Sequence, residues 1–330
     1  MSTNTVTSTI DTTEPSKPFW RRGWFKQYGG MLCGLAGLVV LFAVLSGSFL
    51  SVNNLTNVVL QVSIIAITAF GMTYVLLLGE IDLSVGSMIA LVGTVAALAM
   101  SHGFSVWSVI PLAMLIAILL GMANGVLSAT LGIPSFIVTV ATMGIFRGLA
   151  YIVSDGTPIS IADEPFLAIG NGDWLSIPIP IWILLGLLVI NHFVLSKTVF
   201  GRQVYLTGGN REAAVYSGIN VTMLKIKVFM VIGVMAGISG LILASRLYSA
   251  QPNSAMGYEL DAIAAAVLGG TSLSGGYGTV LGTIIGALII GVINNGMNLL
   301  SVPYFYQLIV KGLVILVAVY LDVQHKKHRG

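Results

Sequence analysis

The chain has 330 residues, of which 56% are hydrophobic and only 8% are charged, and its mean hydropathy is +0.96. Soluble domains carry about 25% charged residues, so this composition excludes an ordinary water-soluble enzyme or binding module. We expect an all-α integral membrane protein. The 39 glycines fit this class, because small residues let membrane helices approach closely. The net charge of +3 is informative mainly through its distribution along the chain.

The N-terminal segment, residues 1–28, is rich in Ser and Thr and has no periodic apolar face, so we expect a disordered cytoplasmic tail. Its last residues carry basic side chains and precede an apolar run at 29–50. This run shows no small-residue cleavage site, which favours an uncleaved first span over a signal peptide. Cys33 lies in the run as the only cysteine, so it cannot form an internal disulfide, and we expect it to be buried.

Ten segments are apolar enough to cross a bilayer as helices, a crossing that takes about 20 residues. The eighth is short and begins with Glu259 and Asp261, so it is either a full span or a re-entrant half-helix. The expected spans, which together make a transmembrane domain over 29–322, are 29–50, 56–79, 83–101, 108–130, 135–153, 179–196, 226–246, 259–274, 277–300 and 304–322.

Lys and Arg concentrate in the N-terminal flank, in the loop 197–227 and in the tail 323–330. Because cytoplasmic loops of membrane proteins are enriched in these residues, we expect all three segments in the cytoplasm. The loop 154–178 contains four acidic residues and no basic one, so we expect it on the opposite, periplasmic side. Ten spans would place both termini in the cytoplasm, which agrees with the position of every basic segment.

Short sequence matches suggest that the chain has two related halves of five spans each. They are 80–82 with 259–261, 131–136 with 300–305, and Asn124-Gly125 with Asn295-Gly296. Because five is odd, the second half would enter the membrane from the opposite side and form an inverted repeat, an architecture on which many transporters are built. The alternative is that Pro and Gly recur at helix ends by chance.

The sequence contains no Gly-Lys dipeptide and therefore no G-x-x-x-x-G-K-[ST] nucleotide-binding loop. The glycine-rich stretch 269–278 has no lysine and lies between two apolar runs, so we interpret it as a tight interhelical turn. The four histidines are scattered, and no pairing of a nucleophile with a base is evident. We therefore expect no catalytic residues, no metal, no cofactor and no nucleic-acid partner.

Ionisable side chains in or beside membrane spans are costly and are candidates for function. Four acids, Glu80, Asp82, Glu259 and Asp261, lie at span boundaries, where the helix dipole alone could stabilise them. The remaining two candidates, both inside expected spans, are Arg147 and Lys311. Each could reach the interface, pair with a carboxylate or contact a substrate.

Uncharged polar side chains suit a sugar-like substrate, because they offer hydrogen bonds without a fixed charge. The alternative is interhelical hydrogen bonding, which contributes about 0.6 kcal/mol on average. Asn294 and Asn298 share one helix face by their spacing. The candidates for a translocation pathway are Gln61, Asn124, Asn294, Asn295 and Asn298, with Thr139 and Thr142 as further polar groups.

The loop 197–227 is the only long interior segment that is polar and basic. Within it, Asn210 is placed to cap a short helix over 211–216, and Gly218 is placed to end that helix in a left-handed conformation. A short, capped helix between two spans could contact a soluble partner and transmit its motion. The alternative is a merely solvated basic loop.

Four separated motifs, in order, resemble the permease subunit of ribose-type ABC sugar importers. They are Gly79-Glu80-Ile81-Asp82-Leu83-Ser84-Val85-Gly86, Arg147-Gly148 with Gly156-Thr157-Pro158-Ile159, Gly208-Gly209-Asn210 with Ala213-Ala214 and Ser217-Gly218-Ile219, and Gly257-Tyr258-Glu259-Leu260-Asp261-Ala262-Ile263-Ala264 leading to Leu268-Gly269-Gly270-Thr271-Ser272-Leu273. Asp82, Glu259 and Asp261 are the acidic motif positions. The resembled family commonly has a small or neutral residue where this chain has Glu80.

The resemblance implies a multi-pass permease of the bacterial inner membrane that carries a pentose or hexose such as ribose, or a similar small polyol-like solute. It implies a second permease subunit, a cytoplasmic ABC ATPase and a periplasmic sugar-binding protein as partners, within membrane lipid. The residues expected to couple to the ATPase are Gly209, Asn210, Arg211, Glu212, Ala213, Ala214 and Gly218. The alternative function is that of a secondary transporter or channel for a small polar solute.

Overall fold

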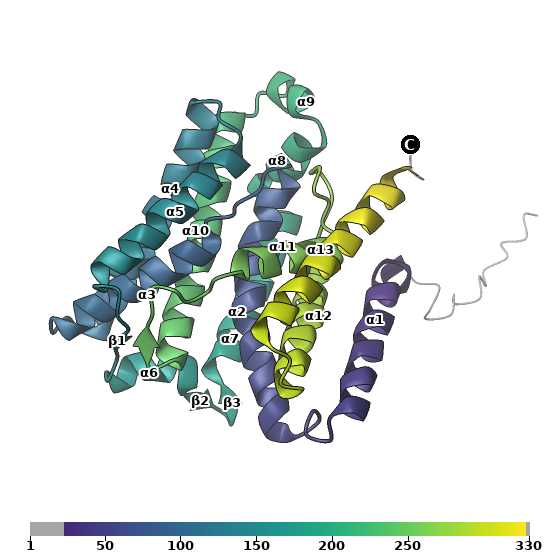
Figure 1. Ribbon diagram of the computed structural model, residues 1–330. Helices are drawn as coiled ribbons and strands as arrows, with labels where there is room; N and C mark the ends of the chain where they lie inside the picture. The colour runs from purple at the N-terminus through teal and green to yellow at the C-terminus, as the bar shows by residue number, and fades with distance from the viewer. Residues whose placement is uncertain (1–22, 328–330) are drawn as a thin grey trace, which may run out of the picture.

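The computed structural model describes residues 23–327, which form helices joined by short loops and four two-residue strands (Figure 1). Helix α1 begins at Gly23, so the expectation of a disordered tail over 1–28 is wrong for residues 23–28, and its remainder lies outside the described residues. The tail expected at 323–330 continues helix α13 as far as Lys327, and residues beyond that point also lie outside the described chain.

The elements follow one another as α1 (Gly23–Leu45), α2 (Val52–Leu77), α3 (Val85–Ser101), α4 (Val106–Thr130), α5 (Ser135–Val153), β1 (Ile159–Ser160), α6 (Glu164–Asn171), β2 (Asp173–Trp174), β3 (Ile177–Pro178), α7 (Ile179–Lys197), α8 (Val199–Gly209), α9 (Arg211–Tyr216), α10 (Val221–Arg246), β4 (Ser249–Ala250), α11 (Tyr258–Leu268), α12 (Val280–Leu299) and α13 (Tyr304–Lys327).

Seven helices in the described part of the chain are long and apolar enough to cross a membrane, namely α2, α4, α5, α7, α10, α12 and the apolar part of α1. Helix α3 and the apolar part of α13 are somewhat shorter. Helix α11 has 11 residues and is therefore about 16 Å long, roughly half the thickness of the hydrocarbon core. The predicted eighth span, 259–274, extends beyond the observed helix, which ends at Leu268 and is followed by a glycine-rich loop.

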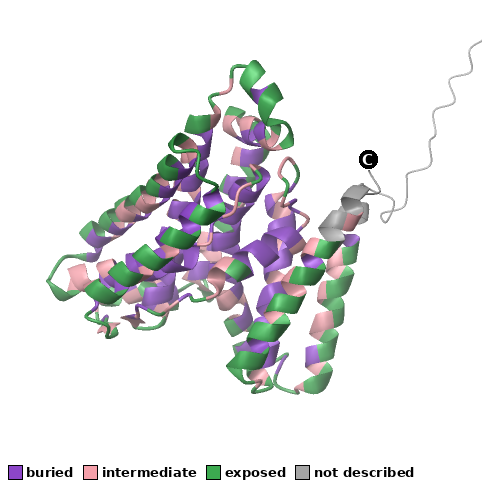
Figure 2. Cartoon of the chain, turned by 45° about the horizontal axis from the view of Figure 1, so that its top comes forward, coloured by how far each residue is buried: buried purple, intermediate pink, exposed green. Residues whose placement is uncertain are grey.

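Helices α2 and α10, each of 26 residues, form the centre of the fold. Helix α2 packs against α10, α11 and α12, and α10 packs against α2, α3 and α4. Where the two central helices meet, the hydroxyl oxygens of Thr68 and Ser239 are 3.0 Å apart. Figure 2 shows buried residues concentrated in this centre, whereas the peripheral helices expose many side chains. The peripheral faces are apolar, as expected for surfaces that contact lipid or another membrane helix.

The two ends of the helix bundle differ. Helices α8 and α9 lie at one end, and α6 with strands β1, β2 and β3 lies at the other (Figure 1). Strand β1 pairs antiparallel with β4, and this pairing joins the loop after α5 to the loop after α10. The loop 154–178 contains the short helix α6, which begins after Asp163, whose carboxylate accepts a hydrogen bond from Phe166 N.

Helix α1 packs mainly against α12, so much of its surface is uncovered. Cys33 lies on this uncovered surface and is exposed. The expectation of a buried Cys33 is therefore wrong. An apolar run indicates a membrane helix, but in lipid it does not indicate which of its residues face protein.

Candidate functional site

Helix α9 has the predicted limits and the predicted caps. Asn210 Oδ1 accepts a hydrogen bond from Ala213 N at 2.9 Å, which satisfies one of the free amides of the first turn. Gly218 follows the helix with a φ of 78°, a conformation that favours glycine. The predicted helix over 211–216 is confirmed. On its surface Tyr216 is 91% exposed.

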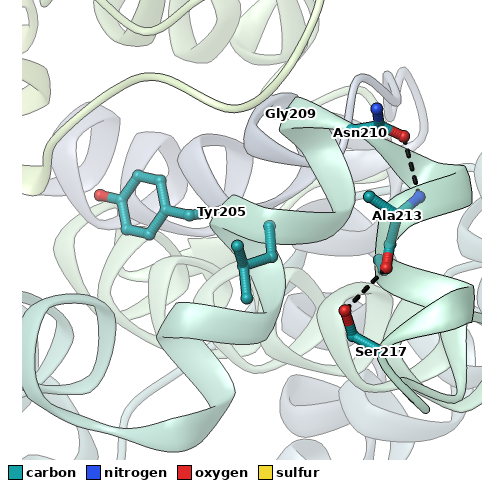
Figure 3. A pocket seen from close by; sticks show the side chains of 7 residues that line it. Tyr205, Gly209, Asn210, Ala213 and Ser217 are labelled. Atoms are coloured by element: carbon teal, nitrogen blue, oxygen red, sulfur yellow. Dashed lines mark hydrogen bonds between the residues drawn. The ribbon is translucent and has the colours of Figure 1, made fainter.

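A groove of about 240 Å³ runs between α8 and α9 (Figure 3). Tyr205, Leu206 and Gly209 line it from α8, and Ala213 and Ser217 line it from the α9 side. The Ser217 hydroxyl donates a hydrogen bond to the carbonyl of Ala213 at 2.8 Å, which closes the end of the short helix. The groove and the exposed side chains of α9 together form part of the surface at this end of the molecule.

Close contacts hold α8 against the end of α2. A side chain at Gly208 would collide with the carbonyl oxygen of Leu77, and the same carbonyl accepts a hydrogen bond from Gly276 N at 2.9 Å. The Tyr205 hydroxyl donates to Gly278 O at 2.7 Å, and burial raises the pKa of Tyr205 to about 12. The stretch 269–278 is therefore an interhelical turn, as predicted, and it supports α8.

An unwound segment of the chain, residues 78–84, joins α2 to α3. Asp82 is fully buried there, and its Oδ1 accepts hydrogen bonds from the amide and the hydroxyl of Ser84 at 2.8 and 2.7 Å. Asn124 of α4 donates to the same hydroxyl at 2.8 Å. Beside them, Glu80 forms an ion pair with Lys225 of α10. On α5, the Ser135 hydroxyl accepts a hydrogen bond from Ile81 N at 3.2 Å and the Thr139 hydroxyl donates to Ile81 O at 3.3 Å. Side chains thus join the segment to α4, α5 and α10.

The second acidic motif has a similar arrangement. Asp261 on α11 accepts a hydrogen bond from Asn294 of α12 at 3.2 Å and forms an ion pair with Lys311 of α13 at 2.9 Å. Lys311 therefore pairs with a carboxylate, one of the three roles considered for it. Among the described residues, no group of three or more His, Cys, Asp or Glu side chains could hold a metal ion.

The three asparagines on α12 form side-chain hydrogen bonds to three different helices, α11, α2 and α13. Asn294 donates to Asp261, and Asn295 exchanges hydrogen bonds with Asn54 of α2 at 3.0 and 3.1 Å. Asn298 accepts a hydrogen bond from Gln307 of α13 at 2.9 Å. The structure thus separates these three side chains, which sequence reasoning had grouped. Sequence reasoning missed Asn54, and its only signal was a polar residue near the start of an apolar run.

Gln61 has a different position, because its side chain lines a cavity of about 370 Å³ between α2, the end of α10 and the segment 247–258. Arg147 of α5 borders the same segment and donates hydrogen bonds to the carbonyls of Pro252 and Ser254 at 2.6 and 2.8 Å. Glu259 accepts a hydrogen bond from Gly257 N at 3.2 Å. Arg147 therefore binds backbone carbonyls, a role that its position in an apolar run does not predict.

The family follows from comparison with known proteins. A family model described as branched-chain amino acid transport system / permease component matches residues 54–319. The chain belongs to this family. It is a transport component and not an enzyme. No solved structure matches the chain significantly.

The relatives of this permease include proteins named for sugars. The chain is 47% identical to the ribose import permease protein RbsC of Haemophilus influenzae over 86% of its own length and 90% of the relative. It is 48% identical to RbsC of Bacillus subtilis over 89% and 92% of the two chains. It is 41% identical to the L-arabinose transport system permease protein AraH of Escherichia coli over 97% of each. These matches confirm the resemblance to ribose-type permeases.

Proposed function

We propose that this permease is the membrane subunit of an ATP-driven ABC importer that carries a monosaccharide, a pentose or hexose such as ribose, or a similar small polyol-like solute. The observation that carries the proposal is the identity of 40–48% to permeases named for ribose and arabinose along most of the chain. The family model is described by branched-chain amino acids and matches residues 54–319, whereas relatives named for ribose and arabinose align over 86–97% of the chain.

Energy would enter through helix α9. The permease would bind a separate ABC ATPase with Gly209 to Gly218, including Arg211, Glu212 and Ala214. The α8–α9 groove and the exposed apolar side chains Leu206, Val215 and Tyr216 support this role, because such a surface is costly to leave in water. The close packing of Gly208 on α2 would carry a displacement of α9 into the centre of the fold.

The membrane arrangement would be ten membrane-inserted helices in two inverted halves, with α11 as a half-helix. The packing supports this arrangement, because the contacts of α2 with α11 and α12 are mirrored by those of α10 with α3 and α4. Each half also has a buried aspartate beside an asparagine, Asp261 with Asn294 and Asp82 with Asn124, which share the Ser84 hydroxyl, although the sequence match aligns Asn124 with Asn295. Both termini, α8 and α9 would lie in the cytoplasm, and α6 with β1, β2 and β3 would face the periplasm.

This arrangement would place the protein in the bacterial inner membrane with a periplasmic sugar-binding protein on the α6 side. A second permease subunit would complete the translocation pathway. The peripheral helices α1, α5, α7 and α13 leave extensive apolar faces uncovered, which supports contact with lipid and with another subunit. Asn124, Asn294, Asn295 and Asn298 would act within the pathway only if their hydrogen bonds rearrange during transport.

The rival function, a secondary transporter with an ionic pathway, has less support. Glu80 and Lys311 both form ion pairs within the protein, and Arg147 donates its hydrogen bonds to two backbone carbonyls. Side chains that carry ions through a membrane need exchangeable contacts, whereas these groups have their charges or donors occupied.

Reconstitution into proteoliposomes tests the proposal. With its ATPase and binding protein, the permease should accumulate labelled ribose or arabinose in an ATP-dependent manner and should not accumulate labelled leucine. Without the ATPase, an ion gradient should drive no uptake. Concentrative, ion-driven uptake by the permease alone would contradict an ABC mechanism, and ATP-driven uptake of leucine in place of a sugar would contradict the substrate class.

A further inference from the structure

A cavity lined by several polar side chains lies at the proposed periplasmic end of the central helices α2 and α10. It has a volume of about 370 Å³ and lies between α2, the end of α10 and the segment 247–258. Gln61, Arg246, Gln251, Asn253 and Tyr258 contribute polar side chains to its wall. The volume lies in the range of about 300–1,000 Å³ that is usual for ligand pockets. It can hold one sugar ring with a few water molecules.

The polar groups on this wall are not engaged with the rest of the protein. Within residues 23–327, the side-chain amides of Gln61, Gln251 and Asn253 make no hydrogen bond to another residue. In the same part of the chain, the Arg246 guanidinium forms no ion pair with a carboxylate. Gln61 and Gln251 are half-buried, and Asn253 is exposed at the mouth of the cavity. Several uncommitted amides that converge on one cavity are therefore available to a ligand.

The chemistry of the wall suits a neutral polyhydroxylated ring. Amide groups can both donate to and accept from hydroxyl groups, and an arginine offers several donors in a fixed plane. Leu243, Leu247 and Ala255 complete the wall with apolar surface for the carbon face of a sugar. Among the described residues that line the cavity none carries a carboxylate, so this wall offers no counter-charge to a cationic solute. A branched aliphatic solute would leave the amides without partners.

The cavity wall is also held in place. Arg147 donates to the carbonyls of Pro252 and Ser254, and strand β4, near the start of this segment, pairs with β1. Gln61 is the residue of α2 that lines the cavity. It lies nine residues after the start of that helix at Val52, so it is about 13 Å from the helix start. A solute at Gln61 would already be inside the outer half of the membrane.

We propose that this cavity is a low-affinity subsite at which the permease itself binds a monosaccharide before passage across the membrane. The proposal rests on the proposed function, because it takes its ligand class from it. It adds that the permease contributes to substrate selection through Gln61 and Gln251, independently of any periplasmic binding protein.

Protection of an introduced thiol tests the subsite without a transport readout. In a Cys33→Ser background, Asn253→Cys places a thiol at the cavity mouth, and Phe104→Cys places a control thiol on the exposed α3–α4 loop. In the complete permease–ATPase complex, ribose in the millimolar range should slow maleimide labelling at position 253 about threefold, the factor for a site two-thirds occupied. Labelling at position 104 should not change, and leucine should protect neither site.

Two further variants test whether protection of the thiol at position 253 depends on the polar side chains of the cavity wall. Gln61→Ala and Gln251→Ala should each abolish the protection at position 253, so failure of one variant to fold leaves the other as a test. Unchanged labelling with ribose, equal slowing at both thiols, or equal protection by leucine would overturn the subsite. ATP-driven ribose uptake is measured on the same preparation. ATP-driven ribose uptake without protection of the thiol at position 253 overturns the subsite alone. Absence of ATP-driven sugar uptake overturns the proposed function.

Discussion

Lys225 Nζ lies 2.5 Å from Glu80 Oε1, and this ion pair joins the beginning of α10 to the unwound segment that follows α2. Both side chains are largely buried, with 8% and 18% of their surfaces exposed. Helix α10 follows α9 after a short turn, and the segment after Glu80 contains the buried Asp82. The pair therefore lies between the proposed ATPase contact and one of the two acidic motifs.

Replacing Glu80 alone should destabilise the protein. Glu80→Gln leaves the Lys225 ammonium in a largely buried position without its counter-charge, at a cost of about 3 kcal/mol. Thermal unfolding of the purified protein in detergent measures this loss. The double variant Glu80→Gln, Lys225→Met should recover most of the stability, because it removes both charges. Equal stability of Glu80→Gln and the parent protein would show that the ion pair contributes little.

The cap of α9 should matter for the ATPase and little for folding. Asn210→Ala removes the hydrogen bond to Ala213 N, which costs about 1 kcal/mol. A helix of six residues has little stability of its own, so α9 should fray. Binding of the ATPase, measured by titration of the purified partners, should weaken about fivefold, the equivalent of 1 kcal/mol.

The matched control for that change is Asn220→Ala. Asn220 caps α10 in the same way, accepting a hydrogen bond from Met223 N at 2.9 Å. Because α10 has 26 residues packed into the centre of the fold, loss of its cap should leave ATPase binding unchanged. Equal weakening by both variants would remove α9 from the coupling mechanism.

Gly121→Ala should disrupt the contact between α4 and α10. A Cβ atom at this position would collide with the carbonyl oxygen of Phe229, so the helices would have to separate. Overpacking of this kind costs about 1–3 kcal/mol, and thermal unfolding should detect it. The same change at Gly186 on α7, where a Cβ atom would meet no neighbour, should cost nothing. Similar melting temperatures for the two variants would contradict the close helix packing.

Arg147→Lys should loosen the segment 251–257. Lysine is a point charge and cannot reproduce the two hydrogen bonds that one Arg147 nitrogen donates to Pro252 O and Ser254 O. Loss of one charge-assisted bond costs about 1.5 kcal/mol, so amides of this segment should exchange hydrogen for deuterium about tenfold faster. Arg202→Lys, on the exposed side of α8, should leave the exchange of this segment unchanged. Unaltered exchange in Arg147→Lys would show that other contacts hold the segment.

The sequence by itself determined the class of the protein and most of its long helices. Long apolar runs must form helices in lipid because each backbone polar group has to be satisfied within the segment. The range predicted for α5, 135–153, therefore agrees with its observed bounds. The cap at Asn210 was equally predictable, because capping depends on neighbours within a few residues.

The tertiary structure alone decided which side chains meet. Glu80 with Lys225, and Asn295 with Asn54, pair across helices that are distant in the sequence. Such pairs depend on where helices cross and how each is rotated, which hydropathy does not encode. The same reason explains the exposed Cys33. It also explains why Gln61 faces a cavity while the asparagines of α12 bind neighbouring helices.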